Sequence, residues 1–496
     1  MNWFIPVSVI AWALLLTIWY LCCGAAPFKK RGIRVLLGLG GVTVVIFALS
    51  SLLRYEGSAS GSSFPKFSWI WENQPERKLP PSIEIVRGIA ISPKELDSAS
   101  GDLNQIFGPD RNAMWNEASF KTDWSTDSPR LVWRRPIGMG WSSFVVNGTR
   151  AITQEQDGDD ECVTCINLST GETEWQYKNE GVRLLLAKAE IPGAAMGGDG
   201  PRSTPVIHQD KIISLGSTGI VNCLKLETGE LIWSRNVIEE FDGRLQEWGQ
   251  ANAPLVLSEL GIVVIPGTAK TGVDLVAFNI KNGEDAWVHQ GSGASFSSPR
   301  MMTFSGVSMI VCCNAQTATG HDPKTGKSLW TYEWPGNFPR VGQPQQVGEN
   351  RILFTASYGM GSPLIEIQKA GTQWTVSEIW KSTRLKTKFS TAVIQGDQAV
   401  GLDEGRLASI HLATGSIRWK GDKYGFGQNL LFGNTLLIQS EAGAVVIGQL
   451  KPDGFTETGR IDDALSSMTW NAPAVAGRFL LIRNDKEAVC YLLPAR

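Results

Sequence analysis

The sequence is poor in charge, and neither sign is in clear excess. Only 19% of its 496 residues are charged, and the formal net charge is -2. A protein that binds nucleic acid through the phosphates needs a basic surface. This chain has no such excess, so nucleic acid is not an expected partner.

Motifs of common enzyme classes are also missing. The four histidines are His208, His289, His321 and His411, and no two of them form the H-x-x-H pair that binds zinc on one face of a helix. No G-x-S-x-G sequence marks a hydrolase nucleophile. The sequence therefore predicts neither a zinc site nor hydrolase chemistry.

Glycine and tryptophan are abundant, with 53 and 19 residues. A chain of 496 residues is too long for one ordinary hydrophobic core, so internal repeats are expected. Many short strands, joined by tight turns and held by periodic aromatic residues, have this composition. The composition favours an all-β repeat protein.

Two uncharged apolar runs open the chain, at residues 3–23 and 35–53. Each is about long enough to cross the roughly 30 Å hydrocarbon core as a helix. Basic residues lie between them, from Lys29 to Arg34. Because short basic loops stay in the cytoplasm, residues 1–54 are expected to form a transmembrane hairpin that places the rest of the chain outside the cytoplasm.

The remainder divides by composition. Residues 55–105 are rich in Ser, Gly and Pro and are expected to form a linker and leader segment. Residues 106–496 are expected to form the folded domain.

One short motif, T-G-x-x-x-W, recurs at a fixed spacing, with Asn once in place of Thr. Its glycine and tryptophan stand at Gly171 and Trp175, Gly229 and Trp233, Gly283 and Trp287, Gly326 and Trp330, and Gly415 and Trp419. A β-rich stretch precedes each copy. A large ring on the outer strand can fill the widening gap between adjacent blades of a propeller, so the repeat is predicted to pack blades.

Further outer strands complete the set. Trp133 and Trp380 occupy the tryptophan position without a T-G pair, and a strand near Thr458 has no tryptophan. Outer strands are predicted at 131–135, 173–177, 231–235, 285–289, 328–332, 378–382, 417–420 and 458–462. They alternate with eight three-strand stretches, which predicts an eight-bladed β-propeller of four-stranded antiparallel blades. The first outer strand should pair with the last stretch, from about Trp470 to Leu493, and close the ring.

Cysteine has a simpler explanation than redox or metal chemistry. Cys162 and Cys165 form a lone C-x-x-C pair, and residues three apart on a strand point to opposite faces. Cys165 and Cys223 each lie six residues before a motif glycine. The same position in other units is held by Ala277, Gly320, Ser409 and, in the last blade, Cys490. We therefore predict a packing position for small residues.

The repeat resembles that of the pyrroloquinoline quinone (PQQ) propeller superfamily, which includes quinoprotein alcohol dehydrogenases and the outer-membrane assembly lipoprotein BamB. The resemblance covers about 130–496, and the tryptophans lack the following Asp of WD repeats. The segments FGPDRNAMW (107–115), GGDGPRSTP (197–205) and KYGFGQ (423–428) look like a subgroup found in planctomycete-like bacteria. This resemblance, with the hairpin, implies a multi-pass protein of the bacterial inner membrane with its propeller in the periplasm.

The resemblance also raises the question of a cofactor. Quinoprotein alcohol dehydrogenases carry an adjacent-cysteine disulfide beside PQQ, which makes Cys312 and Cys313 candidates; the other interpretation is strand packing, with one side chain toward each neighbouring blade. Those enzymes also need Ca²⁺, held by Glu, Asn and Asp side chains, and an Asp base. No residue here matches that motif. No cofactor is therefore expected, and PQQ with calcium is the alternative.

The turns that lead into the innermost strands of a propeller converge on its axis, so a binding site is expected at the channel mouth. Their side chains can hold a flat anionic ligand, a sugar or a peptide segment; alternatively, Trp and Gly plug a narrow funnel and the charges are solvated. The candidate ligand-binding residues are Trp141, Ser142, Asp199, Arg202, Trp248, Asn252, Ser297, Arg340, Lys386, Lys388, Gln428, Trp470 and Asn471.

Three functions follow from these patterns. The first is a non-enzymatic, membrane-anchored binding or scaffold module for a protein or glycan partner. The second is a PQQ- and calcium-dependent membrane quinoprotein dehydrogenase, since the anchor resembles that of membrane glucose dehydrogenases. The third is a sensor that signals through the hairpin, although only residues 24–34 would face the cytoplasm.

Overall fold

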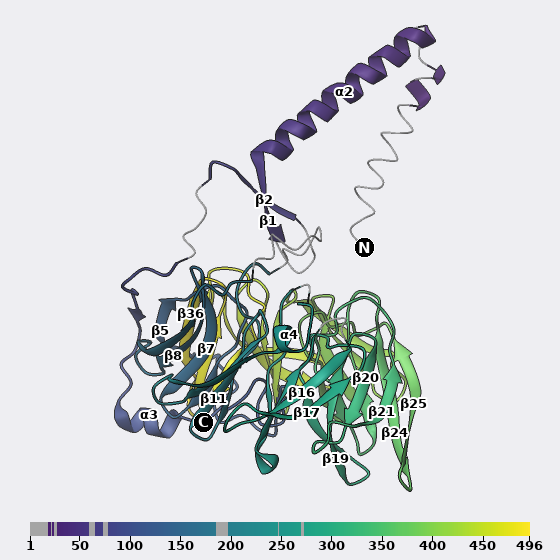
Figure 1. Ribbon diagram of the computed structural model, residues 1–496. Helices are drawn as coiled ribbons and strands as arrows, with labels where there is room; N and C mark the ends of the chain where they lie inside the picture. Colours follow the sequence, from purple (N-terminus) through teal and green to yellow (C-terminus); the bar gives the residue numbers. More distant parts are fainter. Residues whose placement is uncertain are drawn as a thin grey trace. The chain divides into compact units, whose positions relative to one another are not determined.

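A computed structural model of the chain is shown in Figure 1. The residues that the structure describes are 18–20, 22, 23, 27–58, 65–72, 78–184, 197–246, 248–268 and 272–496. The chain divides into two compact units, one of Met1–Glu56 and Pro65–Gln74, the other of Gly57–Phe64 and Pro75–Arg496.

The N-terminal unit contains the helix α2 (Phe28–Leu52). The basic residues from Lys29 to Arg34 lie inside this helix, so their prediction as a connecting loop was wrong; Lys and Arg favour helix, and Pro27 is placed to begin one. Most of the first predicted membrane helix, 3–23, lies outside the described residues. In the part of the chain that is described, no helix has both the length and the hydropathy needed to cross a bilayer.

A two-stranded sheet follows α2, made of β1 (Leu53–Ser58) and β2 (Pro65–Trp69). Residues 78–105, assigned to a linker by composition, contain β3 (Val86–Arg87) and α3 (Pro93–Ala99). Ser92 caps α3 by accepting a hydrogen bond from the backbone N–H of Glu95 (3.2 Å).

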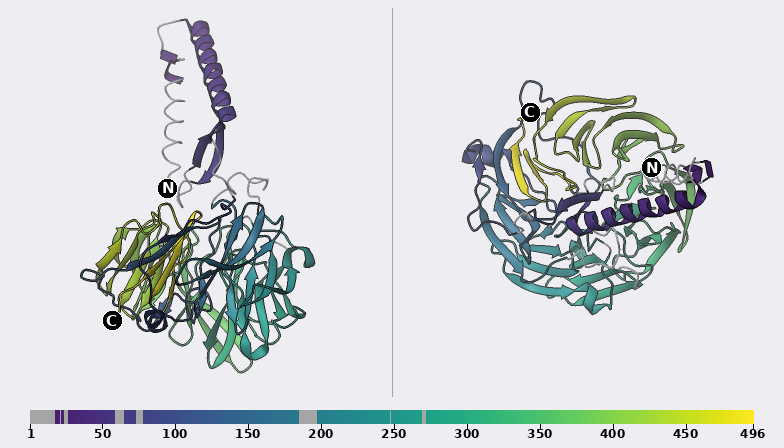
Figure 2. Two further views of the ribbon diagram at one scale, coloured as in Figure 1. Left: turned by 90° about the vertical axis from the view of Figure 1, so that its left-hand side faces the viewer. Right: turned by 90° about the horizontal axis from the view of Figure 1, so that it is seen from above.

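The second unit is a ring of eight antiparallel sheets around a central axis, as Figure 2 shows in its right-hand view. The all-β, eight-bladed fold with four-stranded blades is therefore confirmed. Within blades 1 to 7 the strands run in chain order from the axis outwards, whereas in blade 8 the outer strand, β5 (Arg130–Pro136), comes before the other three in the chain. A short helix, α4 (Val237–Glu240), and a 3₁₀ turn, η2 (Ser258–Leu260), lie between strands.

Blades 1 to 4 consist of β6 (Val145–Asn147), β7 (Arg150–Asp157), β8 (Asp160–Asn167) and β9 (Thr173–Asn179); β10 (Val206–His208), β11 (Lys211–Leu215), β12 (Ile220–Lys225) and β13 (Leu231–Asn236); β14 (Leu255–Leu257), β15 (Ile262–Pro266), β16 (Val273–Asn279) and β17 (Asp285–Gln290); β18 (Arg300–Phe304), β19 (Val307–Cys313), β20 (Thr317–His321) and β21 (Ser328–Glu333).

Blades 5 to 8 consist of β22 (Gln345–Val347), β23 (Arg351–Leu353), β24 (Ser362–Ala370) and β25 (Gln373–Ser382); β26 (Val393–Gln395), β27 (Gln398–Asp403), β28 (Arg406–His411) and β29 (Ile417–Lys423); β30 (Gln428–Phe432), β31 (Thr435–Gln439), β32 (Val445–Lys451) and β33 (Gly454–Ile461); β34 (Ala474–Ala476), β35 (Phe479–Arg483), β36 (Glu487–Leu492) and β5 (Arg130–Pro136).

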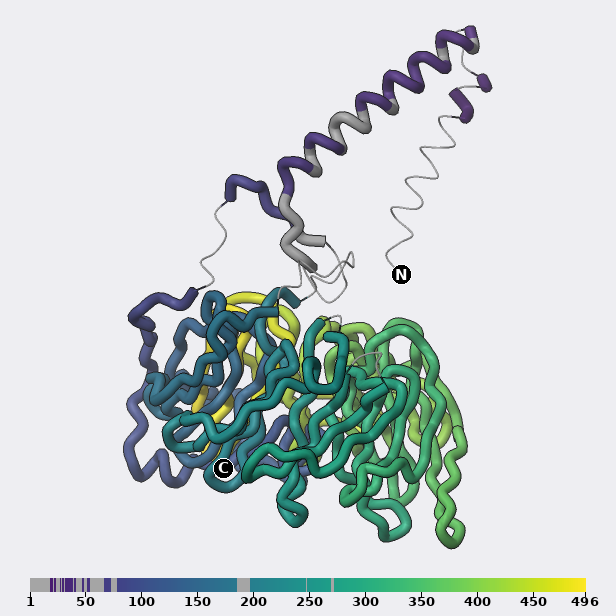
Figure 3. Tube along the Cα trace, in the orientation of Figure 1, coloured from purple at the N-terminus to yellow at the C-terminus, as the bar shows by residue number. Residues whose placement is uncertain are grey.

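Blade 8 closes the ring as the sequence predicts. Its outer strand β5 pairs antiparallel with β36, with Trp133 opposite Cys490. Figure 3 shows the blue start and the yellow end of the propeller side by side there. The strand β3 pairs with the outer side of β5, so the chain before the propeller covers the edge of this blade.

The repeat tryptophans pack between blades. Each motif glycine has a positive φ and lies against the tryptophan of the preceding blade; a Cβ on Gly283 would lie 2.8 Å from the ring of Trp233. The Trp233 indole N–H donates to the carbonyl of Ile280 in the next blade (2.8 Å). Matching bonds are made by Trp133, Trp175, Trp287 and Trp380. The motif is therefore a device that joins consecutive blades.

The small-residue position is confirmed as well. Cys165 lies opposite Trp175 in the sheet, and Cys223 lies opposite Trp233, each directly before a β-bulge. A larger side chain would collide with the indole on the neighbouring strand. Burial raises the pKa of Cys165 and of Cys223 to about 12, which keeps both thiols unreactive.

We expect Trp233→Phe to lower the free energy of unfolding by about 1 kcal/mol, because the ring is kept and one hydrogen bond between blades is lost. Equilibrium unfolding in urea measures the change. The matched control is Trp374→Phe, on the hairpin of β24 and β25. The ring of Trp374 is only half-buried, and this substitution removes no hydrogen bond between blades. Equal effects at both positions would contradict the role of the indole N–H.

A segment of residues 99–124, here called the crossing segment, runs across the channel end opposite the mouth. Backbone or side-chain hydrogen bonds join it to the innermost strand, or a residue beside it, in each of the eight blades. These bonds pair Leu103 with Val146, Asn104 with Ile207, Arg111 with Pro254, Asp110 with Arg300, Asn112 with Gln345, Met114 with Ile394, β4 (Met114–Trp115) with β30, and Ala99 with Arg478.

The crossing segment also supplies a tryptophan that the repeat lacks. In blade 7, Gly459 pairs with Ile447 beside a bulge, the position that tryptophan holds in other blades. The side chain of Trp124 fills this space: it is 3% exposed, and a Cβ on Gly459 would lie 2.4 Å from the Cβ of Trp124. The Trp124 N–H donates to the carbonyl of Thr458 (3.0 Å).

Candidate binding site at the channel mouth

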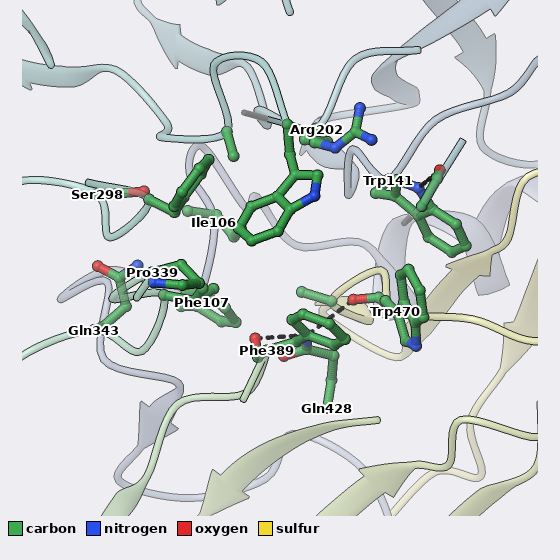
Figure 4. A pocket seen from close by; sticks show the side chains of 16 residues that line it. Ile106, Phe107, Trp141, Arg202, Ser298, Pro339, Gln343, Phe389, Gln428 and Trp470 are labelled. Atoms are coloured by element: carbon green, nitrogen blue, oxygen red, sulfur yellow. Dashed lines mark hydrogen bonds between the residues drawn. The ribbon is translucent and has the colours of Figure 1, made fainter. Parts of the chain in front are cut away.

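The candidate site is a cavity of about 160 Å³ on the axis of the propeller, shown in Figure 4. The turns that lead into the innermost strands supply its wall, and the crossing segment supplies its floor. The lining residues are Ile106, Phe107, Trp141, Gly197, Arg202, Trp248, Ala251, Phe296, Ser298, Pro339, Val341, Gln343, Phe389, Gln428, Trp470 and Ala472.

The floor is formed by Ile106 and Phe107. The chain turns sharply there, with φ of +63° at Phe107 and +83° at Gly108, and the Ala113 N–H donates to the Phe107 carbonyl (3.0 Å). Arg111 fixes the turn by donating to the carbonyls of Ala253 and Pro254 (2.9 and 2.7 Å). Because the crossing segment contacts every blade, the cavity is a cup with one closed end.

Five aromatic residues from different turns lie in the wall of the cup. Trp470 packs against both Trp141 and Phe389, with ring centroids 4.8 Å apart in each pair. Trp248 packs against Phe296, with centroids 5.2 Å apart. A flat or apolar group that enters the cup meets ring faces from several turns.

Two polar atoms in the wall have no partner within the described part of the chain. Gln428 donates from Nε2 to the carbonyls of Phe389 and Trp470 (3.0 and 2.8 Å, dashed in Figure 4), which leaves its Oε1 unsatisfied. The indole Nε1 of Trp248 is likewise buried without an acceptor. Both atoms are therefore buried polar groups without a hydrogen-bond partner among the described residues, which costs free energy.

Arg202 is the one cationic residue among the described residues that line the cup. It donates to the carbonyls of Gly198 and Gly200 (2.7 Å each), which shapes the turn before β10. Burial lowers the pKa of Arg202 to about 10, and the charges of Asp199 and Glu161 oppose that shift. Arg202 is therefore charged at neutral pH.

Five of the predicted site residues line the cup: Trp141, Arg202, Trp248, Gln428 and Trp470. Four others are buried and have a structural setting: Ser142, Asn252, Ser297 and Asn471. Asn252 donates to the carbonyls of Ser295 and Ser297 (2.8 and 2.7 Å), and Asn471 donates to that of Ser142 (2.8 Å). These amides join neighbouring turns across blades.

The four charged candidates that remain do not line the cup. Asp199 pairs with Arg183 (2.5 Å), and Lys386 pairs with Asp403 (2.6 Å). Arg340 donates to the carbonyl of Ala315 (2.6 Å) and stacks on a tryptophan ring.

Lys388 packs beside the wall, with its Nζ 4.5 Å from the ring of Tyr358 and 4.8 Å from that of Phe426. Burial lowers the pKa of Lys388, and the charges of Glu404 and Glu441 oppose that shift. The amine lies among aromatic rings, whose faces attract a cation.

The sequence did not indicate the floor. Ile106 and Phe107 come from the segment before the first blade, and the spacing of the repeat says nothing about where that segment runs. The wall residues Phe296 and Phe389 lie in turns that were predicted to converge, but they were not singled out. The one local sign was an aromatic residue followed by Gly-Pro, which is typical of a sharp turn.

Comparison with known proteins identifies the family. A family profile described as outer membrane protein assembly factor BamB matches residues 122–265 and 159–421, together more than half of the chain. The chain belongs to the BamB family. No curated protein matches the chain.

Solved structures share the fold at low identity. BamB from Moraxella catarrhalis has 15% identity and a TM-score of 0.50, over 71% of this chain and 94% of that one. A quinohemoprotein alcohol dehydrogenase from Comamonas testosteroni has 11% identity and a TM-score of 0.56, over 82% and 83%. A europium-containing methanol dehydrogenase has 11% identity and a TM-score of 0.57, over 81% and 99%.

The BamB-family cup does not fit calcium-bound PQQ. Ca²⁺ takes about six to eight oxygen ligands, mostly carboxylates and carbonyls. No carboxylate is among the described residues that line the cup, and the described residues contain no cluster of three or more His, Cys, Asp or Glu side chains suited to a metal. The aromatic faces of the cup suit the planar ring of PQQ. The described lining residues do not supply the oxygen ligands that Ca²⁺ needs.

Cys312 and Cys313 also differ from a cofactor-stacking disulfide. Both are free and buried in the middle of β19. Cys312 packs with residues of blade 3, including Trp287, and Cys313 packs with residues of blade 5, including Phe354. The two side chains thus face opposite neighbouring blades, which confirms the strand-packing interpretation.

Proposed function

We propose that this BamB-family chain is a non-enzymatic binding module that holds a protein partner at the channel mouth. The observation that carries the proposal is a cup closed at one end, walled by aromatic rings and free of carboxylates among its described lining residues. Such a surface suits an apolar anchor of a partner, because buried aromatic contacts carry most of the energy of protein interfaces. A catalytic site for proton transfer would need a titratable group at the cup.

The setting we propose is the periplasmic side of a bacterial inner membrane. Two features support it: the uncharged apolar runs 3–23 and 35–53, and the basic residues from Lys29 to Arg34, which flank the second run as the first turns of α2. Release of the full chain from membranes by carbonate without detergent would contradict this anchor.

An exposed ring beside the cup offers a direct test of partner binding. Phe338 is 50% exposed, stacks on Tyr358 with centroids 5.4 Å apart, and directly precedes Pro339 of the wall. Native co-purification of the full chain, followed by mass spectrometry, should recover the same partner repeatedly. We expect Phe338→Asp to lower recovery at least tenfold, the effect of about 1.4 kcal/mol. The control Ile417→Asp, on the exposed outer strand β29, should retain it.

The second candidate is a quinoprotein dehydrogenase, favoured by the flat aromatic walls and by Arg202, which suits an anionic ring. We expect the full chain, incubated with PQQ and Ca²⁺, to show no calcium-dependent binding of PQQ at micromolar concentration and no reduction of an artificial electron acceptor. Isothermal titration and a dye-reduction assay make the two measurements. Turnover of the dye that requires both additions would overturn the binding-module proposal.

A further inference from the structure

We infer that the cup takes a single aromatic side chain from an extended segment of a partner protein. The inference rests on the proposed function and names the chemistry of the partner. Four properties of the cup support it: its volume, its ring walls, its floor, and two polar atoms that have no partner among the described residues.

The volume matches one ring. An engineered apolar cavity of about 150 Å³ binds benzene. The cup, at about 160 Å³, is of that size. It therefore has room for the ring of one aromatic residue.

The walls are arranged to hold that ring from more than one direction. Trp248 and Phe296 come from the turns before blades 3 and 4, whereas Phe389 and Trp470 come from those before blades 6 and 8. Aromatic rings prefer offset-stacked or edge-to-face contacts at about 4.5–7 Å between centroids. A guest ring among these residues can adopt such contacts on several sides at once.

The two unpartnered atoms suit a peptide backbone. Every peptide unit carries one carbonyl acceptor and one N–H donor. The indole N–H of Trp248 requires an acceptor, and the Oε1 of Gln428 requires a donor. A peptide segment that delivers an aromatic side chain brings both groups with it, so burial of the wall atoms is compensated on binding.

A glycan suits this cup less well. A sugar buried against Ile106, Phe107 and Val341 would leave hydroxyl groups without hydrogen-bond partners, and each unpaired polar group costs free energy. An aromatic side chain has no such cost on an apolar floor. The closed floor also means that the segment enters and leaves by the mouth and does not thread the channel.

The test uses the full chain and a defined probe, N-acetyl-phenylalanine methylamide, which carries one ring and a peptide unit on either side. Saturation-transfer NMR measures its affinity. Ala251 lines the cup, and we expect Ala251→Leu to abolish binding by filling the space. Trp248→Phe keeps a ring and removes the N–H, so we expect binding to weaken about three- to tenfold. Trp374→Phe, on the outer hairpin of blade 5, is the matched control and should bind as the parent chain does.

The outcomes separate this inference from the proposed function. Binding of the probe that is lost in Ala251→Leu and kept in Trp374→Phe supports the inference, provided that urea unfolding shows both variants folded. A partner recovered equally well by the parent chain and by Ala251→Leu overturns the inference and leaves the binding module in place. Binding of N-acetylglucosamine or cellobiose at the cup, in place of the phenylalanine probe, also overturns it and assigns a glycan.

Discussion

Trp124→Ala is expected to lower the free energy of unfolding by about 3–5 kcal/mol, the usual cost of removing a buried tryptophan. The loss is large because this ring fills the gap at the outer strand of blade 7, where Gly459 leaves no side chain. It would weaken the contact of the crossing segment with blades 7 and 8. Equilibrium unfolding in urea measures the effect, and Trp374→Ala on the half-buried outer hairpin should cost much less.

A second substitution tests the reason for this effect. Gly459→Trp alone should be destabilising, because a Cβ at Gly459 already lies 2.4 Å from the Cβ of Trp124. In the background of Trp124→Gly, which also removes the Cβ of residue 124, the same change should restore stability, because blade 7 would then carry its own tryptophan. Such a double-mutant cycle isolates the coupling of the two positions. Additive losses would show that Trp124 stabilises the chain in some other way.

The propeller can be predicted from the sequence for a physical reason. A motif such as Gly229 to Trp233 combines a left-handed turn with an outer-strand ring, and both requirements are local and recur in every unit. Blade count, strand positions and ring closure follow from that period. The crossing segment has no period, and Phe107 and Trp124 reach their positions through contacts with strands that are hundreds of residues away in the sequence. No local pattern encodes those contacts.

Only part of the candidate site could be predicted from the sequence. Convergence of the turns on the axis is a property of the fold, so Trp141 and Trp470 could be placed at the cup from their positions in the repeat. The direction of each side chain depends on packing between turns, and polar residues such as Asn252 and Arg340 turned out to bind neighbouring carbonyls. Residue type alone did not distinguish a group that lines the cup from one that supports it.

A buried polar network between blades 3 and 4 contains two titratable groups, Asp274 and His321. We expect them to change the free energy of unfolding with pH in opposite directions. Asp274 is 1% exposed; its Oδ1 accepts from the Gly293 N–H (2.5 Å), and its Oδ2 accepts from Asn314 (3.1 Å). The ring of His321 is fully buried, shares a hydrogen bond with Thr319 (2.7 Å) and donates from Nδ1 to the Gly326 carbonyl (3.0 Å).

Burial shifts the pKa values of the two groups in opposite directions. Burial raises the pKa of Asp274 to about 6, although the Gly293 N–H opposes the shift. Burial lowers the pKa of His321 to about 4, and the nearby ring of His289, whose own pKa is lowered by burial, contributes to this. Each group is therefore held in its neutral form over a pH range in which the unfolded chain would be charged.

The consequences for stability have opposite signs. As pH rises from about 4 to 6, Asp274 loses its proton in the unfolded chain but keeps it in the folded chain. The contribution of Asp274 to the free energy of unfolding therefore falls by about 3 kcal/mol. As pH falls from about 6.5 to 4, His321 gains a proton in the unfolded chain but not in the folded chain. The contribution of His321 to the free energy of unfolding therefore also falls by about 3 kcal/mol. In the parent chain the two effects largely cancel over this range.

Single substitutions should remove that cancellation. We expect Asp274→Asn to be destabilised on acidification below about pH 6.5, and His321→Asn to be stabilised on acidification from about pH 6 to 4, each by up to about 3 kcal/mol. Urea unfolding across this range measures both, and the exposed Asp453→Asn should follow the parent chain. The double variant should vary little with pH. Parallel curves for the two single variants would contradict the opposed shifts, because only groups neutralised in opposite ways can give slopes of opposite sign.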